Sequence, residues 1–192
     1  RIFFVNAPYI GEQISALIEQ HQPRVVALDM SRVPDIEYSA LQMLIEGEAR
    51  FADRGVTLWL APGMNIQRNP LCGRNFEYYS ECGVLSGLTA AAEVSGATEN
   101  GLICYVKHFA FNDQDNYRQN NICTWLNEQS AREIYLKAFE QPIKAGGMGV
   151  MTSMNAVGPV WAGGCKALLT NILRDEWGFH GAVITDAVVS AW

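Results

Sequence analysis

The fold is decided by a short apolar run that ends in polar side chains, Leu102-Ile103-Cys104-Tyr105-Val106 followed by Lys107-His108-Phe109. An unbroken apolar run of this length, without alternating polar residues, predicts a strand buried on both faces. Similar strand-like runs occur at residues 2–5, 25–28, 56–60, 149–153 and 182–185. Segments with helical spacing lie between them, so we expect the strands to pair in parallel through right-handed crossovers.

The helical segments are indicated by apolar residues three and four positions apart. Ser130 and Glu133 have the spacing of a capping box, and Gly178 is placed to end the last helix. The expected helices carry inward faces at Ile10, Ile14, Leu17 and Ile18; at Leu41, Leu44 and Ile45 after Ser39; over 84–96; at Ala131, Ile134, Tyr135, Ala138 and Phe139; and at Leu168, Leu169, Ile172 and Leu173.

This order predicts an α/β fold of about six parallel βα units in a single domain over residues 1–192. Two architectures satisfy it: a flavodoxin-like open sheet, or an incomplete TIM-type (βα) barrel. A closed barrel has eight strands and about 250 residues. With six strands, two sheet edges would be exposed, and a homo-oligomer that pairs them is one expected outcome.

The composition excludes several classes of protein. A net charge of −6 without a basic run argues against nucleic-acid binding. The five cysteines form no CxxC pair, so we expect neither a metal site nor a cofactor, and reduced thiols suit a cytoplasmic location. No apolar run is long enough for a membrane span, and the strand-like start at residues 1–6 does not resemble a signal peptide.

Polar side chains follow the predicted strands at the edge where βα folds bind ligands. Arg74 lies in the loop after residues 56–60, Lys107 and His108 follow 102–106, Asn155 follows 149–153, and Asp186 follows 182–185. One carboxylate, two fixed cations or donors and an amide suit a site that holds a sugar beside a nucleophile. Each residue alone has a plainer explanation, since an Asp at a strand end commonly anchors a loop.

The first third of the chain resembles one family of proteins. Residues 25–41, Val-Val-Ala-Leu-Asp-Met-Ser-Arg-Val-Pro-Asp-Ile-Glu-Tyr-Ser-Ala-Leu, with flanking strands at 3–7 and 55–60, are similar to the STAS domain of sulfate-permease-type transporters. The resemblance implies that Ser39 is a candidate phosphorylation site. The alternative is that Ser39 caps the following helix.

Residues 61–192 resemble glycoside hydrolase family 3, the β-glucosidase family. The motifs are Ala61–Ile66, Gly73–Glu81, Lys107-His108-Phe109, Asn112-Asp113-Gln114, Arg132–Lys137 and Leu173–Phe179. The resemblance implies a retaining β-glucosidase mechanism with Asp186 as nucleophile and with Arg74, Lys107 and His108 as ligands of sugar hydroxyls. The sequence departs from the family pattern at Cys82-Gly83, Met154 and Ala187.

A retaining mechanism needs a second carboxyl group about 5–5.5 Å from the nucleophile as acid/base. In this family it usually comes from a second domain, so its identity here is open, with Glu77, Asp113 and Glu128 as conceivable donors. The family's early Asp-Gly-Pro-like segment is also replaced by STAS-like residues. We therefore expect weak or no hydrolysis.

The two resemblances together predict a hybrid joined in the strand at 56–60. Natural fusions join whole domains through linkers. The alternatives to a glycosidase are therefore an engineered or recombinant chimera without catalytic function and, less favoured, a STAS-type regulatory binding module. The partner expected for the enzyme is a small sugar or β-glucoside, without nucleic acid or membrane.

Overall fold

The structure is a computed structural model that describes residues 12–13, 16–17, 19–21, 58–118 and 122–186. Ser39 and the strands expected at 2–5 and 25–28 lie outside these residues. The elements in chain order are β1 (Leu58–Trp59), α3 (Gly83–Glu99), β2 (Ile103–Phe109), β3 (Cys123–Thr124), α4 (Glu128–Ser130), the π-helix η1 (Ala131–Tyr135), α5 (Leu136–Lys144), β4 (Gly149–Thr152), β5 (Ala156–Val157), β6 (Val160–Trp161), the 3₁₀ turn η2 (Ala162–Gly164), the π-helix η3 (Ala167–Glu176) and β7 (Ala182–Thr185).

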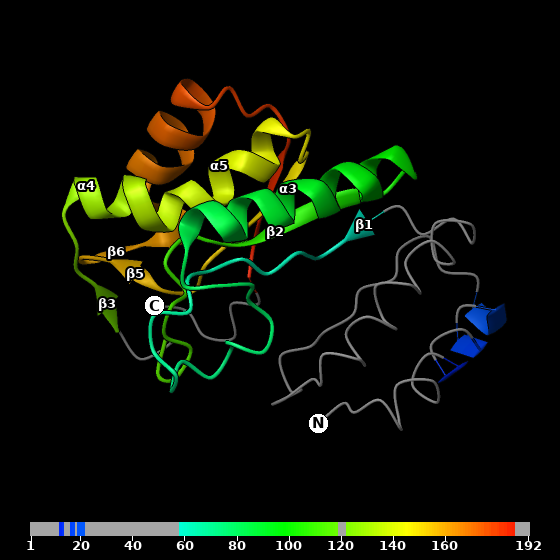
Figure 1. The fold of residues 1–192 in the computed structure, drawn as a ribbon, viewed down its shortest axis with the longest axis horizontal. Coiled ribbons are helices and arrows are strands. Elements are labelled where there is room, and N and C mark those ends of the chain that lie inside the picture. The colour runs from blue at the N-terminus through cyan, green and yellow to red at the C-terminus, as the bar shows by residue number, and fades with distance from the viewer. Residues whose placement is uncertain (1–11, 14–15, 18, 22–57, 119–121, 187–192) are drawn as a thin grey trace.

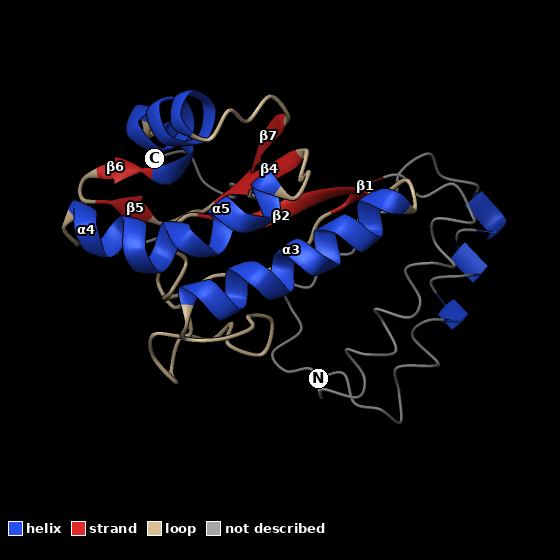
Figure 2. Cartoon of the chain, turned by 45° about the horizontal axis from the view of Figure 1, so that its top comes forward, coloured by secondary structure: helices blue, strands red, loops and turns tan. Residues whose placement is uncertain are grey.

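The main sheet is parallel, with strand order β1-β2-β4-β7. Each of its strands pairs with the next parallel strand along the chain, and α3 and α5 lie side by side on the same side of the sheet (Figures 1 and 2). An unreversed order with helices on one side is that of a barrel wall, whereas a flavodoxin-like sheet reverses its order. The α/β class with parallel βα units is confirmed.

The register of the sheet depends on one glycine. Gly149 of β4 pairs with Tyr105 of β2 and with Ala182 of β7. A Cβ at Gly149 would lie 2.6 Å from Cγ of Tyr105 and 2.7 Å from the carbonyl oxygen of Cys104. Any larger residue would push β4 away from β2. Glycine at this position therefore allows the close pairing of the two strands.

Helix α3 meets its neighbours through small residues. Its buried positions include Gly83, Ser86, Gly87 and Ala90. A Cβ at Gly83 would lie 2.2 Å from the backbone oxygen of Ile134. Small side chains therefore bring the backbone of α3 close to η1 and α5.

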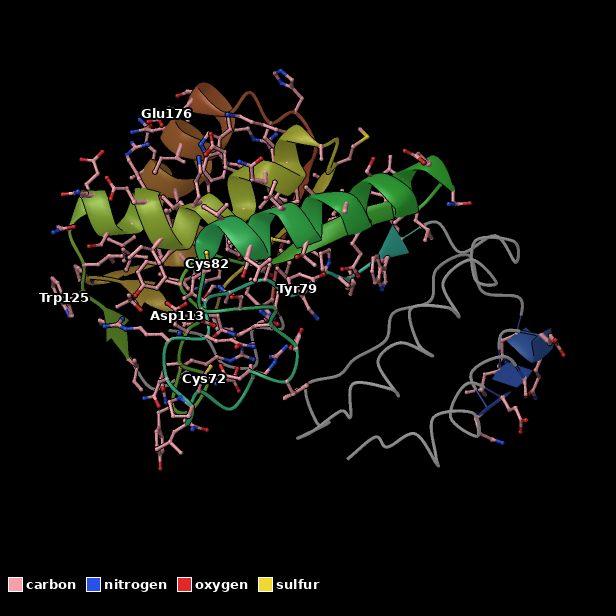
Figure 3. All side chains as sticks on the ribbon, viewed as in Figure 1. Cys72, Tyr79, Cys82, Asp113, Trp125 and Glu176 are labelled. Atoms are coloured by element: carbon pink, nitrogen blue, oxygen red, sulfur yellow. The ribbon has the colours of Figure 1, made fainter. Side chains whose placement is uncertain are left out.

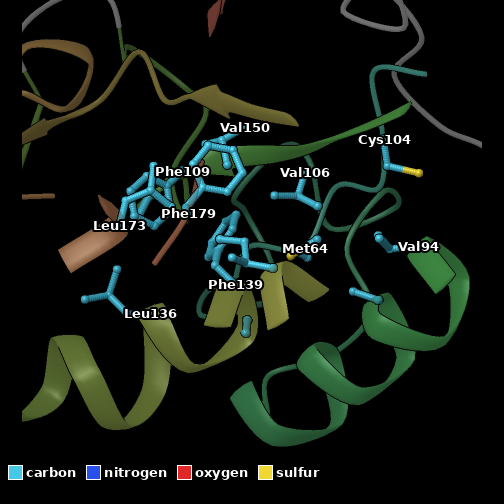
Figure 4. Packing of buried hydrophobic residues seen from close by; sticks show 14 of the residues in the cluster. Met64, Val94, Cys104, Val106, Phe109, Leu136, Phe139, Val150, Leu173 and Phe179 are labelled. Atoms are coloured by element: carbon cyan, nitrogen blue, oxygen red, sulfur yellow. The ribbon is translucent and has the colours of Figure 1, made fainter. Parts of the chain in front are cut away.

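The core lies between the sheet and these helices (Figure 4). Phe109 of β2 packs edge-on against Phe139 of α5 and Trp177, with ring centroids 5.3 Å and 5.9 Å apart. Val150 and Leu173 complete the fully buried centre. Burying side chains of this size stabilises the fold by about 1.5–3 kcal/mol each, and it holds the strand ends in fixed positions.

Three predictions of local structure need correction. The small sheet β3-β5-β6 was not expected, because its two-residue strands have no apolar period to reveal them. Asn127, not Ser130, caps the fourth helix: its side chain accepts a hydrogen bond from Ser130 N at 2.8 Å. Leu17 is 56% exposed rather than buried, because a helical period shows which residues share a face and not whether that face is covered.

Helix η3 ends as predicted, with Gly178 at a φ of 68° directly after its last turn. Within the described ranges, no helix combines the length and apolar composition needed to cross a membrane.

Candidate active site

The predicted site residues gather where the parallel strands end. Lys107 and His108 lie in the last three residues of strand β2, and Asp186 directly follows β7. The Asp186 amide donates to the carbonyl oxygen of Thr152 at 3.2 Å, which extends the β4–β7 pairing by one bond and holds the residue at the strand end. Arg74 enters from the loop between β1 and α3. Figure 3 shows the two neighbouring loops through Cys72 and Asp113, below the helices in that view.

Asn65 holds the backbone of His108 from both sides. Its Nδ2 donates to the His108 carbonyl oxygen at 2.9 Å, and its Oδ1 accepts from the His108 amide at 2.8 Å. Lys107 forms two further backbone bonds with this segment, to Pro62 O and from Met64 N. The peptide bonds Lys107–His108 and Phe109–Ala110 are both cis. The sequence analysis did not identify Asn65 as a site residue.

Glu77 is the shared counter-ion of two cations. Lys107 Nζ lies 3.0 Å from Glu77 Oε1, and Arg74 Nε donates to Glu77 Oε2 at 2.5 Å. Burial raises the pKa of Glu77, but Lys107 and Arg74 lower it further, so the net shift is downward. Burial lowers the pKa of Arg74, but the nearby Glu77 carboxylate raises it by more, so the net shift is upward. Glu77 and Arg74 are therefore both charged at neutral pH.

His108 is buried and neutral. Burial, reinforced by Arg74 and Lys107, lowers its pKa well below the usual value. Its Nε2 lies 3.4 Å from Arg74 Nη2 and 3.7 Å from Asp186 Oδ2, and its Nδ1 lies 3.3 Å from the Tyr78 hydroxyl. A neutral imidazole in this place is a hydrogen-bond partner for a hydroxyl rather than a fixed charge.

A second arginine, absent from the sequence prediction, contacts the candidate nucleophile. Arg118 Nη1 lies 3.2 Å from Asp186 Oδ2 and 3.1 Å from Asp115 Oδ1. Asp115 in turn lies 3.5 Å from Arg74 Nη1. The available signal was their position just after the quoted Asn112-Asp113-Gln114 motif, with a spacing of three residues that suits a turn. Nothing in that spacing showed that the turn reaches β7.

Asn155 does not join this group directly. It is fully buried; its Nδ2 donates to the Gln114 carbonyl oxygen at 2.9 Å, and its Oδ1 accepts from Ser153 Oγ at 2.7 Å. These bonds tie the loop before Arg118 to the end of β4. They indicate a structural role for Asn155, and a direct sugar contact stays a prediction that they do not support.

The site's described charges balance. The cations Arg74, Lys107 and Arg118 are matched by the carboxylates of Glu77, Asp115 and Asp186. Such a network needs no charged ligand to compensate it. It presents donors and acceptors at short range, which is suited to the hydroxyl groups of a neutral molecule.

Comparisons with known proteins agree with this chemistry. Residues 14–191 match the model of the Glycosyl hydrolase family 3 N terminal domain. The chain is 47% identical over 129 residues to beta-glucosidase A of Butyrivibrio fibrisolvens, covering 67% of this chain and 15% of that protein. It is 40% identical over 165 residues to the probable beta-glucosidase J of Neosartorya fischeri, covering 85% of this chain and 19% of that protein.

Solved structures show the same relationship. Beta-glucosidase 3B of Thermotoga neapolitana, in complex with alpha-D-glucose, matches with a TM-score of 0.70 at 42% identity, over 72% of this chain and 19% of that one. The beta-glucosidase of Kluyveromyces marxianus, in complex with glucose, matches with a TM-score of 0.71 at 33% identity, over 78% and 19% of the two chains. The chain thus spans less than a fifth of the length of these relatives.

None of these matches supports the STAS resemblance of residues 1–60, and the family match begins at residue 14. The hybrid therefore stays a prediction. The motifs quoted from residues 61 onward, the barrel-type sheet order and the match over residues 14–191 agree, and the chain belongs to glycosyl hydrolase family 3, where it matches part of the N-terminal domain.

Proposed function

We propose that this chain carries the sugar-binding half of a retaining β-glucosidase site, with Asp186 as the nucleophile. The observation that carries the proposal is the convergence of Asp186, His108 and Arg74 from three separate parts of the chain, with His108 Nε2 within 3.7 Å of both other side chains. Relatives with solved structures are described as bound to glucose. A β-glucoside is therefore the proposed substrate class.

In this proposal, Lys107, Arg74 and His108 each have a role that their surroundings support. Lys107 and Arg74 are held by Glu77, so they present fixed donors to hydroxyl oxygens without a search through rotamers. Neutral His108 donates or accepts one hydrogen bond beside the nucleophile. Hydrogen bonds that strengthen toward the transition state are how glycosidases use such residues.

We infer that the proton donor comes from outside the three carboxyl groups considered from the sequence. Glu77 is ionised and paired with two cations, and its pKa is lowered. Glu128 is exposed at the start of α4 and pairs with Arg132. Burial raises the pKa of Asp113 to about 7, and the charged or titratable groups that Asp113 interacts with are Arg68 and Tyr135. We propose that the chain, taken alone, cleaves only glycosides whose leaving group needs no proton.

The test is covalent trapping with 2,4-dinitrophenyl 2-deoxy-2-fluoro-β-D-glucoside. Asp186 would attack the anomeric carbon while the bond to the phenolic oxygen breaks, and the electron pair would leave with dinitrophenolate. We expect the intact mass to rise by one fluoroglucosyl unit, located at Asp186 by peptide mapping, and Asp186→Asn to abolish the gain. An unlabelled but folded wild-type chain contradicts the proposal and favours the alternative of a non-catalytic chimera.

Three finer predictions accompany this proposal. A cytoplasmic location rests on the free thiols of Cys72, Cys82 and Cys165.

Self-association through sheet edges is tested by light scattering, where a stable monomer contradicts it. A STAS-derived origin of residues 1–60 requires strands at 3–6 and 25–28 in the order of that domain, which an experimental structure would show or refute.

A further inference from the structure

The end of helix α3 contains the only Asn-Gly pair in the sequence, Asn100-Gly101. In such a pair the main-chain nitrogen of the second residue approaches the side-chain carbon of the first with little hindrance, because glycine has no Cβ and few backbone restrictions. Both residues are exposed. Water and hydroxide ions therefore reach the two groups that can react with each other.

The fold requires a glycine at this place. Gly101 has a φ of 85°, the left-handed conformation in which many helices end. Its amide donates to Thr98 O at 2.9 Å, and the Leu102 amide donates to Ala97 O at 3.0 Å. These two bonds make up a Schellman motif, and both Leu102 and Ala97 belong to the buried core. The glycine half of the reactive pair is therefore set by the way in which α3 ends.

The same motif keeps the reacting groups apart. The Gly101 nitrogen is hydrogen-bonded to Thr98 O, and Nδ2 of Asn100 donates to Gly96 O at 2.8 Å. The ψ of Asn100 is 12°, which turns the Gly101 nitrogen toward the main-chain nitrogen of Asn100 and away from its Cβ. A ring between the Gly101 nitrogen and the Asn100 side chain needs that nitrogen on the Cβ side. Closing the ring thus requires the helix end to open first.

We propose that Asn100 is a site of spontaneous deamidation and that the Schellman motif at the end of α3 sets its rate. Base removes the Gly101 amide proton, the Gly101 nitrogen attacks Cγ of Asn100, the Cγ–Nδ2 bond breaks, and Nδ2 takes up a proton and leaves as ammonia. Water then opens the cyclic imide. Attack of water at Cγ gives aspartate, and attack at the main-chain carbonyl carbon gives isoaspartate. Water is the co-reactant, and nothing is oxidised or reduced.

The two products affect the fold differently. Aspartate adds a negative charge at the C-terminal end of α3, beside Glu99, where the helix dipole disfavours it. Isoaspartate also moves the side-chain methylene into the main chain, so the path from Ala97 to Leu102 is longer by one atom. The two bonds of the motif then lose their spacing. Because Leu102 leads directly into β2, this product weakens the attachment of α3 to the main sheet.

The experiment compares the folded chain with the same chain in denaturing urea, both kept in mildly alkaline buffer. Peptide mapping by mass spectrometry follows the replacement of the Asn100 amide by a hydroxyl group. The variants are Asn100→Gln, which would have to close a larger ring, and Gly96→Ala, which strengthens the last turns of α3 where no atom lies within 4 Å of the new Cβ. The internal control is Asn116, which is also exposed but is followed by Tyr117.

We expect Asn100 to be modified in urea, and about tenfold or more slowly in the folded chain, because the helix end must open and break its hydrogen bonds before the attack. Gly96→Ala should slow the reaction of the folded chain about threefold to fivefold, the effect of one Gly-to-Ala change in helix propensity. Its rate in urea should equal that of wild type. Asn100→Gln should remove the signal in both states, and Asn116 should stay unmodified over the same period.

The products are tested by urea denaturation after the aged chain has been separated by charge. Asn100→Asp reproduces the aspartate product and should unfold close to the wild-type midpoint. The isoaspartate form, identified with an isoaspartyl methyltransferase, should unfold at a lower urea concentration. Equal midpoints for the two forms contradict the loss of the motif in isoaspartate.

Two results overturn the proposal. If another asparagine is modified before Asn100 in urea, Asn100 is not the site. If the folded and unfolded chains react at equal rates, or Gly96→Ala changes both rates alike, the motif does not control the reaction. Circular dichroism establishes that Gly96→Ala is folded; if it is not, the comparison of folded and unfolded wild type decides. None of these results depends on whether the fluoroglucoside labels Asp186.

Discussion

Glu77 is the residue on which the charge balance of the sugar-binding side depends. Its carboxylate contacts both Arg74 and Lys107, and all three side chains are nearly buried. Gly63 makes room for it, because a Cβ there would lie 2.7 Å from Glu77 Cγ. The residue matters through the cations that it holds, since two buried positive charges without a counter-ion would repel one another.

Replacing Glu77 by Gln should therefore be severe. The change leaves Arg74 and Lys107 without their shared carboxylate, and breaking a buried ion pair in this way costs about 3–5 kcal/mol. Urea denaturation followed by circular dichroism measures the free energy of unfolding. The control is Glu140→Gln, because Glu140 also pairs with two cations, Lys137 and Lys144, on the outside of α5. That change should cost less than about 1 kcal/mol, and equal costs for the two variants would contradict the buried network.

At the residue scale, the sequence identified the ends of the contacts but not their connections. Arg74, Lys107, His108 and Asp186 were recognised because they follow strands or belong to family motifs. Asn65, Asp115 and Arg118 were missed because their roles depend on partners 41 to 68 positions away in the sequence. Such contacts arise only when the strands end together, and no local pattern encodes them. Asn155 is the opposite case. It follows a strand as the sequence indicated, but its side chain bonds to Gln114 and Ser153, which indicates a structural role.

Helix α3 contains a matched pair of glycines at the element scale. A Cβ at Gly83 would meet the Ile134 carbonyl oxygen at 2.2 Å, whereas nothing lies within 4 Å of one at Gly96. The first glycine is needed for helix contact, and the second only lowers helix propensity. The same substitution should therefore have opposite effects at the two positions.

Gly83→Ala should destabilise the fold by about 1–3 kcal/mol, because η1 and α3 must move apart. Gly96→Ala should stabilise it by about 0.5–1 kcal/mol through helix propensity and a less flexible unfolded chain. Thermal or urea denaturation compares them with wild type. A loss at Gly96 or a gain at Gly83 would show that α3 does not approach η1 as described.

Glu93, also in α3, should make the stability of the fold depend on pH. Its side chain is half-buried and accepts a hydrogen bond from the Tyr79 hydroxyl, and burial raises its pKa from the usual 4.5 to about 7. Because the folded state holds the proton more tightly, the stabilisation is complete below pH 4.5 and is lost as the pH rises through 7. Figure 3 labels Tyr79 below the middle of this helix in that view.

Glu93→Gln should remove this dependence. At pH 8 the variant should be more stable than wild type by about 1–3 kcal/mol, and at pH 4 the two should be nearly equal. Urea midpoints at the two pH values provide the measurement, with the exposed Glu99→Gln of the same helix as control. A difference between Glu93→Gln and wild type that is the same at both pH values would mean that Glu93 does not carry the shifted proton.

The elements of the described region were largely predictable, whereas their ends and the small sheet were not. Long apolar runs gave β2, β4 and β7 within a few residues. The cap at Asn127 was placed one turn late because both Asn127 and Ser130 are good capping residues and only the backbone geometry separates them. Strands β3, β5 and β6 form through pairing across loops, so their sequences carry no period.

At the scale of the whole molecule, the sequence left two architectures open and the strand order separates them. Parallel strands added in chain order build a barrel wall, and their carboxyl ends then lie along one rim. The position of the site follows from this order. The residues that make up the site come from loops that the strand order brings together.

An experimental structure of the chain with glucose tests this account most directly. We expect the sugar at the carboxyl ends of β2 and β7, with Arg74, Lys107 and His108 within hydrogen-bond distance of its hydroxyl groups and Asp186 beneath its anomeric carbon. Glucose bound at another face, or Asp186 separated from Arg118 and His108 in that structure, would contradict the central claim.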